Sequence, residues 1–420
     1  MYYLKVLLLS VVAILLWVAI VVFGALNGWW STAIAPTSDT HSFIDAAIKL
    51  VESKNRGNLA FVVIENGEIF EEYFSSTKDE VTRDTIFPTA SMSKWITATS
   101  VMHLVQQGLL DLDTPVSAYL SRWHLPDNKF DSNKVTTRLL LSHMSGLNDG
   151  LGFGDYNPEE TIPTLESSLT RPRASGEREV TIELGVEPGT EFHYSGGGYL
   201  ILELLVEEIS EETFEAYVRK NILEPLLMSR SGFAYLGDLD NASKAYDPDG
   251  LQATHYRYAA SGATGFSTSI ADLTRFVQFY LGKAQVQRPL PVESLVEMRA
   301  PHASVFGATI WGLGTTLYAP SGSGDYIFGH DGQNEPAINS AVRINPDNGD
   351  ALIALVSGGP SLATELGYEW TLWQTGLPDV LHTERTIRRM LPTIGIGSAL
   401  ILVVMFVMVL RNVRSKKKKS

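Results

Sequence analysis

The chain has 420 residues, of which 45% are hydrophobic and 19% charged, and it contains no cysteine. This length exceeds what one core usually fills, and the composition excludes a disordered or fibrous chain. The absence of cysteine excludes disulfide scaffolds, thiol nucleophiles, thiolate zinc sites and iron–sulfur clusters. A formal net charge of −14 argues against nucleic acid as a partner.

The charge is unevenly distributed along the chain. The two end segments, residues 1–26 and 390–420, contain basic residues and no acidic ones, so the middle is more acidic than the total indicates. An acidic body with basic ends predicts that the ends and the body have different tasks.

An uncharged apolar run extends over residues 6–26, and Ser10 is its only polar residue. As a helix it is about 31 Å long, which is enough to cross the core of a bilayer. Trp29 and Trp30 follow at the depth of a membrane interface. We therefore interpret residues 1–30 as a transmembrane anchor.

Residues 31–41 are polar and are predicted to be a linker. A cleaved signal peptide is the alternative to an anchor, since Ala33-Ile34-Ala35 has the small-x-small pattern of a cleavage site. The apolar run is long for a signal peptide, which favours the anchor.

A second uncharged run covers residues 390–410, after a juxtamembrane segment at 381–389 and before a basic tail at 411–420. The small residues from 395 to 399 could let another helix approach, but we favour a simple lipid-facing span. Basic residues stay on the cytoplasmic side of membranes, so the tail and Lys5 predict that both termini are cytoplasmic. The body is then extracytoplasmic and held at the cell membrane.

Residues 42–380 are predicted to form one domain. Asn66-Gly67 between two β-rich runs is a strong hairpin signal. The pattern predicts helices at 42–52, 91–107 and 362–374, mostly helical segments from 111 to about 280, and strands at 59–64, 68–74, 311–317, 326–329, 337–344 and 351–357. This order indicates an α/β (α+β) fold: a sheet built from both chain ends, flanked by helices, with an inserted, mainly helical subdomain.

Several common motifs are missing. The chain contains no Gly-x-Ser-x-Gly elbow and no His-Glu-x-x-His, and its nine histidines are scattered. We therefore predict no metal site and no cofactor.

The spacing Ser-x-x-Lys occurs three times, and only Ser91…Lys94 opens an amphipathic helix. Residues three apart share a helix face, so the Lys94 amine can reach the Ser91 hydroxyl. A helix N-terminus disfavours an ammonium, and burial depresses its pKa further, which makes Lys94 a candidate base. The alternative is a capping serine beside a surface lysine. Ser75…Lys78 lies in a polar stretch after a strand, and Ser415…Lys418 lies in the tail.

Two more segments place reactive side chains beside glycines. Tyr194 precedes Ser195-Gly196-Gly197 at the start of a helix, where it could act in a cleft; otherwise it is a core aromatic residue. His330 follows a strand that ends in glycine, and a strand N–H there could complete an oxyanion hole with the N–H of Ser91. Otherwise it is a histidine in an edge strand.

Taken together, Ser91-x-x-Lys94, Tyr194-Ser195-Gly196 and His330-Asp331-Gly332 resemble the three motifs of the serine β-lactamase and penicillin-binding protein superfamily. The nearest branch comprises the class C β-lactamase-related serine hydrolases. The resemblance extends over about residues 42–375, through segments such as Leu141-Ser142-His143-Met144-Ser145-Gly146.

The resemblance implies a β-lactamase/transpeptidase-like fold and an acyl-enzyme mechanism. Ser91 would attack a carbonyl, while Lys94 and Tyr194 would shuttle its proton. The backbone N–H groups of Ser91 and Gln333 would form the oxyanion hole. Substrate would bind at His330, Gly332 and Gly196, and His143 would have a structural role.

The resemblance also bears on the substrate. His330 stands where many relatives carry a lysine, and Gly196 stands where the family often has asparagine, which favours an ester or amide over a β-lactam. The partners are thus a small-molecule or peptide substrate and, through two spans, the lipid bilayer; oligomeric state stays open. The alternatives are a DD-carboxypeptidase or β-lactamase, an inactive receptor or scaffold with this fold, and a transporter-associated helix assembly. The pocket walls are expected from residues 148–157 and the loops near Gln333.

Overall fold

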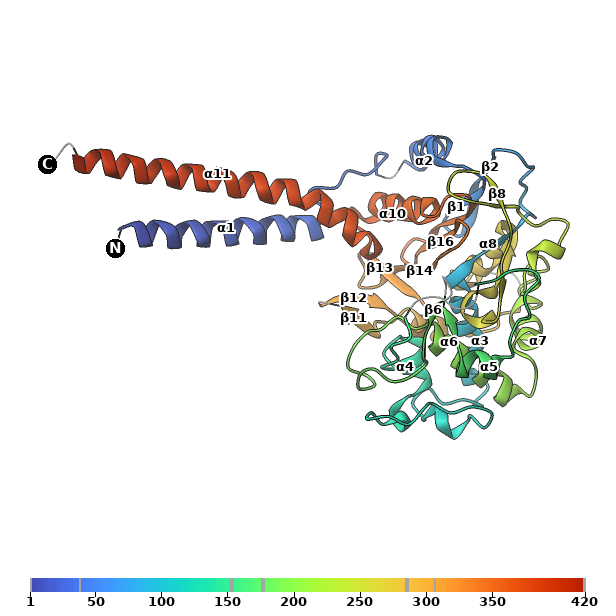
Figure 1. The fold of residues 1–420 in the computed structure, drawn as a ribbon. Coiled ribbons are helices and arrows are strands. Elements are labelled where there is room, and N and C mark those ends of the chain that lie inside the picture. The colour runs from blue at the N-terminus through green and yellow to red at the C-terminus, as the bar shows by residue number, and fades with distance from the viewer. Residues whose placement is uncertain are drawn as a thin grey trace.

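The computed structural model describes residues 2–417, except 38, 151–154, 175–177, 284–286 and 306. An α/β body carries two long helices that leave it side by side (Figure 1). Within the body, helices cover both faces of an antiparallel sheet, and a larger helical region lies beside it. The predicted fold class is confirmed.

The central sheet is built from both ends of the chain. Its nine strands run in the order β11-β12-β13-β14-β16-β17-β1-β2, and β15 pairs with β16 off this path. The N-terminal hairpin adds to the last strand, with Leu59 opposite Val356. The strands are β1 (Asn58–Glu65), β2 (Glu68–Ser76), β11 (Ala303–Val305), β12 (Ala308–Trp311), β13 (Thr316–Pro320), β14 (Tyr326–Gly329), β15 (Asp331–Asn334), β16 (Ile338–Asn345) and β17 (Asp350–Ser357).

Each face of the sheet packs on its own apolar core. Phe43 of α2 and Trp370 of α10 are fully buried on one face. Trp95 of α3 is fully buried on the other, in a larger core that includes α6 and α8. The helices are α2 (Thr40–Lys54), α3 (Ser93–Gln106), α6 (Gly196–Ser210), α8 (Ile270–Tyr280) and α10 (Leu362–Thr375).

The inserted region between β3 and β11 is less helical than predicted. It contains short helices joined by four two-stranded ladders, because glycine, proline and asparagine break the apolar periodicity every few residues. Besides α3, α6 and α8, its helices are the short α4 (Thr137–Leu141), α5 (Leu165–Thr170), α7 (Phe214–Val218) and α9 (Val292–Met298). The ladders are β3/β10 (Ile86–Pro88 with Ser267–Ser269), β4/β9 (Asp155–Tyr156 with Arg257–Tyr258), β5/β6 (Arg173–Ala174 with Arg178–Glu179) and β7/β8 (Ala245–Tyr246 with Gln252–Ala253).

Short 3-10 and π-helical turns also occur along the chain. The 3-10 turns are η1 (Ala90–Met92), η2 (Val116–Ala118), η3 (Ser132–Lys134), η5 (Leu236–Asp238) and η7 (Val380–His382), and the π-helical turns are η4 (Arg219–Leu223) and η6 (Ser261–Gly265). The helix predicted at 91–107 is thus divided, because η1 provides its first turn and α3 continues it.

One strand prediction was wrong, and the strand β15 was missed. Residues 311–317 are not one strand: β12 ends at Trp311 and β13 begins at Thr316. Gly314 has φ +75°, and a Cβ at this position would collide with Ala98, so the chain turns tightly against α3 here. Strand β15 was not predicted, since Asp331-Gly332-Gln333-Asn334 has no apolar alternation.

The end helices α1 (Tyr2–Leu26) and α11 (Thr383–Lys417) run antiparallel, so both termini lie far from the body (Figure 1). Each is long and apolar enough to cross a membrane over Tyr3–Leu26 and Met390–Arg414, with mean hydropathies of 3.2 and 2.7. Trp17 of α1 donates a hydrogen bond to the Thr393 carbonyl over 3.2 Å. A Cβ on Gly397 would overlap its indole, so the small residues accommodate a helix here rather than facing lipid alone.

The segment predicted as a linker is attached to the body. Ala33, Ile34 and Ala35 pack against the core under α10. The Pro36 carbonyl accepts a hydrogen bond from the Trp373 indole N–H over 2.7 Å. These contacts attach the segment between α1 and α2 to the body.

Candidate active site

Ser91 and Lys94 lie where η1 passes into α3. Lys94 has no exposed surface, and its Nζ donates to Ser91 Oγ over 3.3 Å and to the Ala263 carbonyl over 2.9 Å. Burial lowers the pKa of the Lys94 amine to about 7, although the nearby Asp149 carboxyl works against this. A substantial neutral fraction at neutral pH leaves a lone pair free to accept the Ser91 proton.

The turn before Ser91 is strained and firmly held. Ala90 has φ +50°, a conformation that residues other than glycine rarely adopt. Ser93 Oγ donates to the Ala90 carbonyl over 2.6 Å and accepts from the Phe266 N–H over 2.9 Å. Ser340 Oγ donates to the Thr89 carbonyl over 2.8 Å. These bonds fix the Ser91 backbone against both α3 and the sheet.

Tyr194 reaches Ser91 from the loop before α6. Its hydroxyl is hydrogen-bonded to the Ser91 side chain, and burial raises the pKa of the Tyr194 phenol well above its usual range. The Lys94 Nζ lies 5.0 Å from the centre of the Tyr194 ring. Tyr194 therefore stays protonated near neutral pH, so it is suited to relaying a proton and Lys94 to accepting one.

Asp149 anchors the loop that carries Tyr194, and sequence reasoning missed its role. This carboxyl is 5% exposed and accepts from Ser195 Oγ over 2.6 Å and from the Gly197 N–H over 2.8 Å. Burial raises the pKa of Asp149, against the pull of these hydrogen bonds and of Lys94. The only available sequence signal was its place at the start of the predicted pocket wall. Gly196 is buried beside it, at the first turn of α6.

Two buried aromatic residues support Tyr194 from behind. The His143 ring stacks on Tyr194 with ring centres 4.3 Å apart, and its Nδ1 accepts from the Ser195 N–H over 3.1 Å. Burial, with Lys94 and His330 nearby, lowers the pKa of His143 well below its usual range. Trp311 packs edge-on against Tyr194 and against His330. This geometry fits the structural role expected of His143. The contact of Trp311 with Tyr194 was not predicted from the sequence.

His330 lies between β14 and β15, immediately after the strand where it was expected. Its Nδ1 donates to the Asp331 carbonyl over 2.6 Å, since a carbonyl oxygen can only accept. Its Nε2 is buried and has no hydrogen-bond partner in the described part of the chain. Burial lowers the pKa of His330 to about 4, so the ring is neutral and Nε2 offers a lone pair.

Gly332 brings β15 against the turn that carries Ser91. A Cβ at Gly332 would collide with the Thr89 carbonyl and lie 2.6 Å from Ser340 Oγ. Gln333 follows in the same strand, opposite Asn339. The strand with the expected second oxyanion donor therefore runs beside the expected nucleophile.

The structure brings Ser91, Lys94 and Tyr194 into contact, with the His330 segment at the same site. Ser75, which has the same spacing to Lys78, lies in β2, where its Oγ accepts from Asn55 Nδ2 over 3.1 Å. Lys78 instead donates to the Gly250 carbonyl over 3.1 Å. Of the pocket wall predicted at 148–157, residues 151–154 lie outside the described residues.

The model of the beta-lactamase family matches residues 43–375, which is most of the chain. The chain belongs to the beta-lactamase family. This family consists of serine hydrolases with the fold described above.

Curated relatives agree with this membership. Penicillin-binding protein 4 of Amycolatopsis lactamdurans is 29% identical over 302 residues, a match that covers 66% of this chain and 74% of that protein. The putative penicillin-binding protein PbpX of Bacillus subtilis is 26% identical, over 48% of this chain and 45% of that protein. For PbpX the match spans less than half of the relative's length.

A solved structure shares the fold. The octameric penicillin-binding protein homologue from Pyrococcus abyssi superposes with a TM-score of 0.65 at 22% identity, over 81% of this chain and 78% of that one. At this identity the likeness concerns the fold alone.

Proposed function

We propose that this protein is a membrane-anchored serine hydrolase that cleaves an ester or amide through an acyl-enzyme on Ser91. The observation that carries the proposal is the fully buried Lys94 amine, 3.3 Å from Ser91 Oγ and with a pKa near neutrality. A buried amine of this kind activates a serine as nucleophile.

In the first half-reaction, Lys94 accepts the Ser91 proton as Oγ attacks the substrate carbonyl. The proton then passes by way of the Tyr194 hydroxyl to the leaving alkoxide or amine, which departs as an alcohol or amine. The N–H groups of Ser91 and Gln333 stabilise the oxyanion. In the second half-reaction, water attacks the acyl-enzyme and the same groups return the proton to Ser91.

The neutral state of His330 supports an ester or amide as substrate. With Nδ1–H committed to the Asp331 carbonyl, Nε2 is a hydrogen-bond acceptor and offers no positive charge to a carboxylate. A substrate with an N–H or O–H donor fits this position better than the carboxylate of a penicillin or of a peptide C-terminus. The DD-carboxypeptidase or β-lactamase activity is therefore the second candidate.

The two end helices support the anchoring. They lie side by side and are apolar over a length sufficient for a bilayer, while the charged residues gather in the body and the tail. The basic tail favours cytoplasmic termini and an extracytoplasmic body.

A fluorescent fluorophosphonate probe and a p-nitrophenyl ester test the activity on the full-length protein. Labelling and hydrolysis are expected for the wild type and for Ser75→Ala, the matched control with the same Ser-x-x-Lys spacing. Both are expected to disappear in Ser91→Ala with the fold unchanged by circular dichroism. Unlabelled wild-type protein would favour the inactive receptor or scaffold instead. Full labelling of Ser91→Ala would show that the nucleophile is elsewhere.

A further inference from the structure

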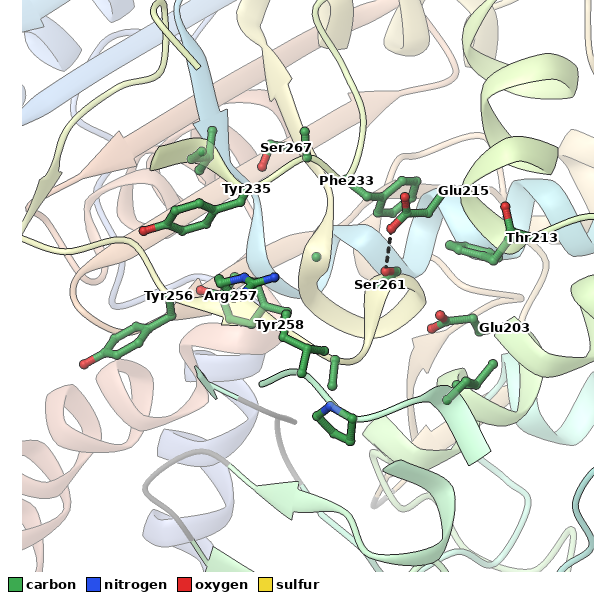
Figure 2. A pocket seen from close by; sticks show the side chains of 18 of the residues that line it. Glu203, Thr213, Glu215, Phe233, Tyr235, Tyr256, Arg257, Tyr258, Ser261 and Ser267 are labelled. Atoms are coloured by element: carbon green, nitrogen blue, oxygen red, sulfur yellow. Dashed lines mark hydrogen bonds between the residues drawn. The ribbon is translucent and has the colours of Figure 1, made fainter. Parts of the chain in front are cut away.

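A cavity lies beyond the η6 turn from Lys94, apart from the candidate active site. It has a volume of about 520 Å³, within the range of small-molecule sites, and Ser91, Lys94 and Tyr194 do not line it. Its walls come from α6, α7, β9 and η6, with aromatic side chains on several sides (Figure 2). The most informative lining residues are Glu203, Glu215, Phe233, Tyr256, Arg257 and Tyr258.

Glu203 is the distinctive group of this cavity. Its side chain comes from α6 and only 6% of the residue is exposed. The Oε2 atom accepts from the Gly262 N–H over 2.8 Å, whereas Oε1 has no hydrogen-bond partner among the described residues. No basic side chain of the described chain forms an ion pair with it. A carboxylate this buried is costly without a cation, so the group holds a proton unless a ligand supplies a positive charge.

The other charged groups around the cavity are the carboxylates of Glu207 and Glu215 and the guanidinium of Arg257. Glu207 of α6 is already paired with Arg122 over 2.6 Å. Glu215 of α7 is exposed and accepts from Ser261 Oγ over 3.1 Å, as Figure 2 shows, with no cation beside it. Arg257 of β9 faces the backbone carbonyls of Pro158 and Glu160, to each of which it donates over 3.3 Å.

We propose that this cavity binds an organic ammonium group, held by the Glu203 and Glu215 carboxylates against the aromatic walls. Aromatic faces attract cations, and burial of the ligand's apolar body adds to the binding. Tyr256 and Tyr258 line the same cavity. The site is separate from the serine, and its ligand is an amine with an aliphatic or aromatic body.

Proton release on binding distinguishes this site from an exposed carboxylate, which is already ionised at pH 7 and has no proton to release. Burial, with Glu207 and Glu215 nearby, raises the pKa of Glu203 to about 8, so most of this carboxyl is protonated at pH 7. A bound ammonium stabilises the carboxylate and expels that proton to the buffer. Binding should therefore release close to one proton at pH 7, and less as the pH rises above 8.

The probes are benzylamine and its neutral counterpart benzyl alcohol, titrated calorimetrically into the full-length protein in detergent, in phosphate and in HEPES, neither of which contains a primary amine. Ser91→Ala protein is used, so that no chemistry at the serine intervenes. Benzylamine is expected to bind at least ten-fold more tightly than benzyl alcohol, with proton release. Equal affinities for the two probes, or no benzylamine binding, would overturn the proposal.

Three variants locate the site. Glu203→Gln keeps an oxygen for the Gly262 N–H, so η6 should hold, and it is expected to weaken benzylamine at least ten-fold and abolish proton release. Glu215→Gln is exposed and cannot disturb the core, and it should weaken binding about three-fold. Glu224→Gln, an exposed control outside the cavity, should bind as the parent does. Parent-like binding in both Glu203→Gln and Glu215→Gln would exclude this cavity.

Discussion

At the scale of single residues, the chemistry depends on one buried amine. The Lys94 ammonium is disfavoured because α3 and η6 exclude water from it. The Ala263 carbonyl accepts a hydrogen bond from Lys94 in either protonation state, whereas Ser91 Oγ accepts one from the ammonium and donates one to the neutral amine. Only its neutral form can take the Ser91 proton. The pH dependence of hydrolysis should report this one group.

We expect kcat/KM for a neutral ester to rise as the pH rises through about 7 and to level off above about 8, because the base is the deprotonated amine. Lys94→Arg stays charged at every accessible pH, so it should lose activity by a factor on the order of 10² to 10⁴ with no recovery at high pH. A pH–rate profile of both proteins checks this. A profile that falls through pH 7, or an active Lys94→Arg, would assign the base elsewhere.

The neutrality of His330 gives a second prediction. Its pKa of about 4 means that it gains charge only in acid, so substrate affinity should show no step from this residue between pH 5 and 9. His330→Ala removes one hydrogen-bond acceptor and should raise KM, at a cost of about 1–3 kcal/mol, with little change in kcat. Steady-state kinetics measures both. Complete loss of acylation in His330→Ala would place it in the proton relay.

The sequence could predict these residues because their three motifs resemble those of the serine β-lactamase and penicillin-binding protein superfamily, and because the spacing of the first motif fits one helix face. Ser91 and Lys94 are one helical turn apart, and Tyr194 and His330 stand beside glycines. Asp149 and Trp311 could not be found in this way. They act through contacts with Tyr194 and Ser195 from distant parts of the chain, and such contacts leave no local pattern.

At the scale of elements, β15 decides how the sheet meets the nucleophile. It lacks the apolar alternation of a strand because it lies at the site, paired with β16 on one side and against η1 on the other. Gly332 permits this approach, since any side chain there meets the Thr89 carbonyl. Apolar alternation in a sequence predicts which face of a strand is buried. It does not predict where the backbones of two segments approach closely, as those of β15 and η1 do.

Gly332→Ala should therefore push β15 away from the Ser91 turn and misplace the Gln333 N–H. We expect acylation to slow by a factor on the order of 10² to 10³, the range for losing one oxyanion donor. Rapid-quench kinetics measures the acylation rate. Gly232→Ala is the control, because a Cβ there meets only the far end of Arg219, at 3.9 Å. An unchanged rate in Gly332→Ala would argue against the oxyanion role of β15.

A buried ion cluster links β15 to the base of the second end helix. Arg343 of β16 has no exposed side-chain surface and pairs with Asp331 of β15 and, over 2.8 Å, with Asp379 before η7. Gly367 of α10 leaves room for the guanidinium, which would lie 2.9 Å from a Cβ there. Through the Arg343 side chain, the cluster connects the His330-Asp331-Gly332 motif to the segment that leads into α11.

Arg343→Met should destabilise the body by about 3–5 kcal/mol, because it leaves the buried Asp379 carboxyl and the partly buried Asp331 carboxyl without a cation. Urea unfolding followed by tryptophan fluorescence measures this. Arg83→Met is the control: its side chain is 52% exposed and its ion pair with Glu72 should contribute about 1 kcal/mol or less. Adding Asp331→Asn and Asp379→Asn to Arg343→Met should restore part of the loss. Similar stabilities for Arg343→Met and Arg83→Met would contradict this account.

At the scale of the whole molecule, the paired end helices determine the topology. Because α1 and α11 run antiparallel and touch at Trp17 and Gly397, the two termini must be on the same side of any membrane that both helices cross, with the body on the other. The basic tail predicts that the side of the termini is the cytoplasm.

Protease added to intact cells should then digest the body while epitope tags at both termini stay protected. Permeabilised cells are the control, in which both tags should be cut. Gly397→Leu should loosen the helix pair without moving the tags, since membrane insertion depends on apolar length and flanking charge rather than on this contact. A tag cut in intact cells, at either end, would mean that only one helix crosses the membrane or that the orientation is reversed.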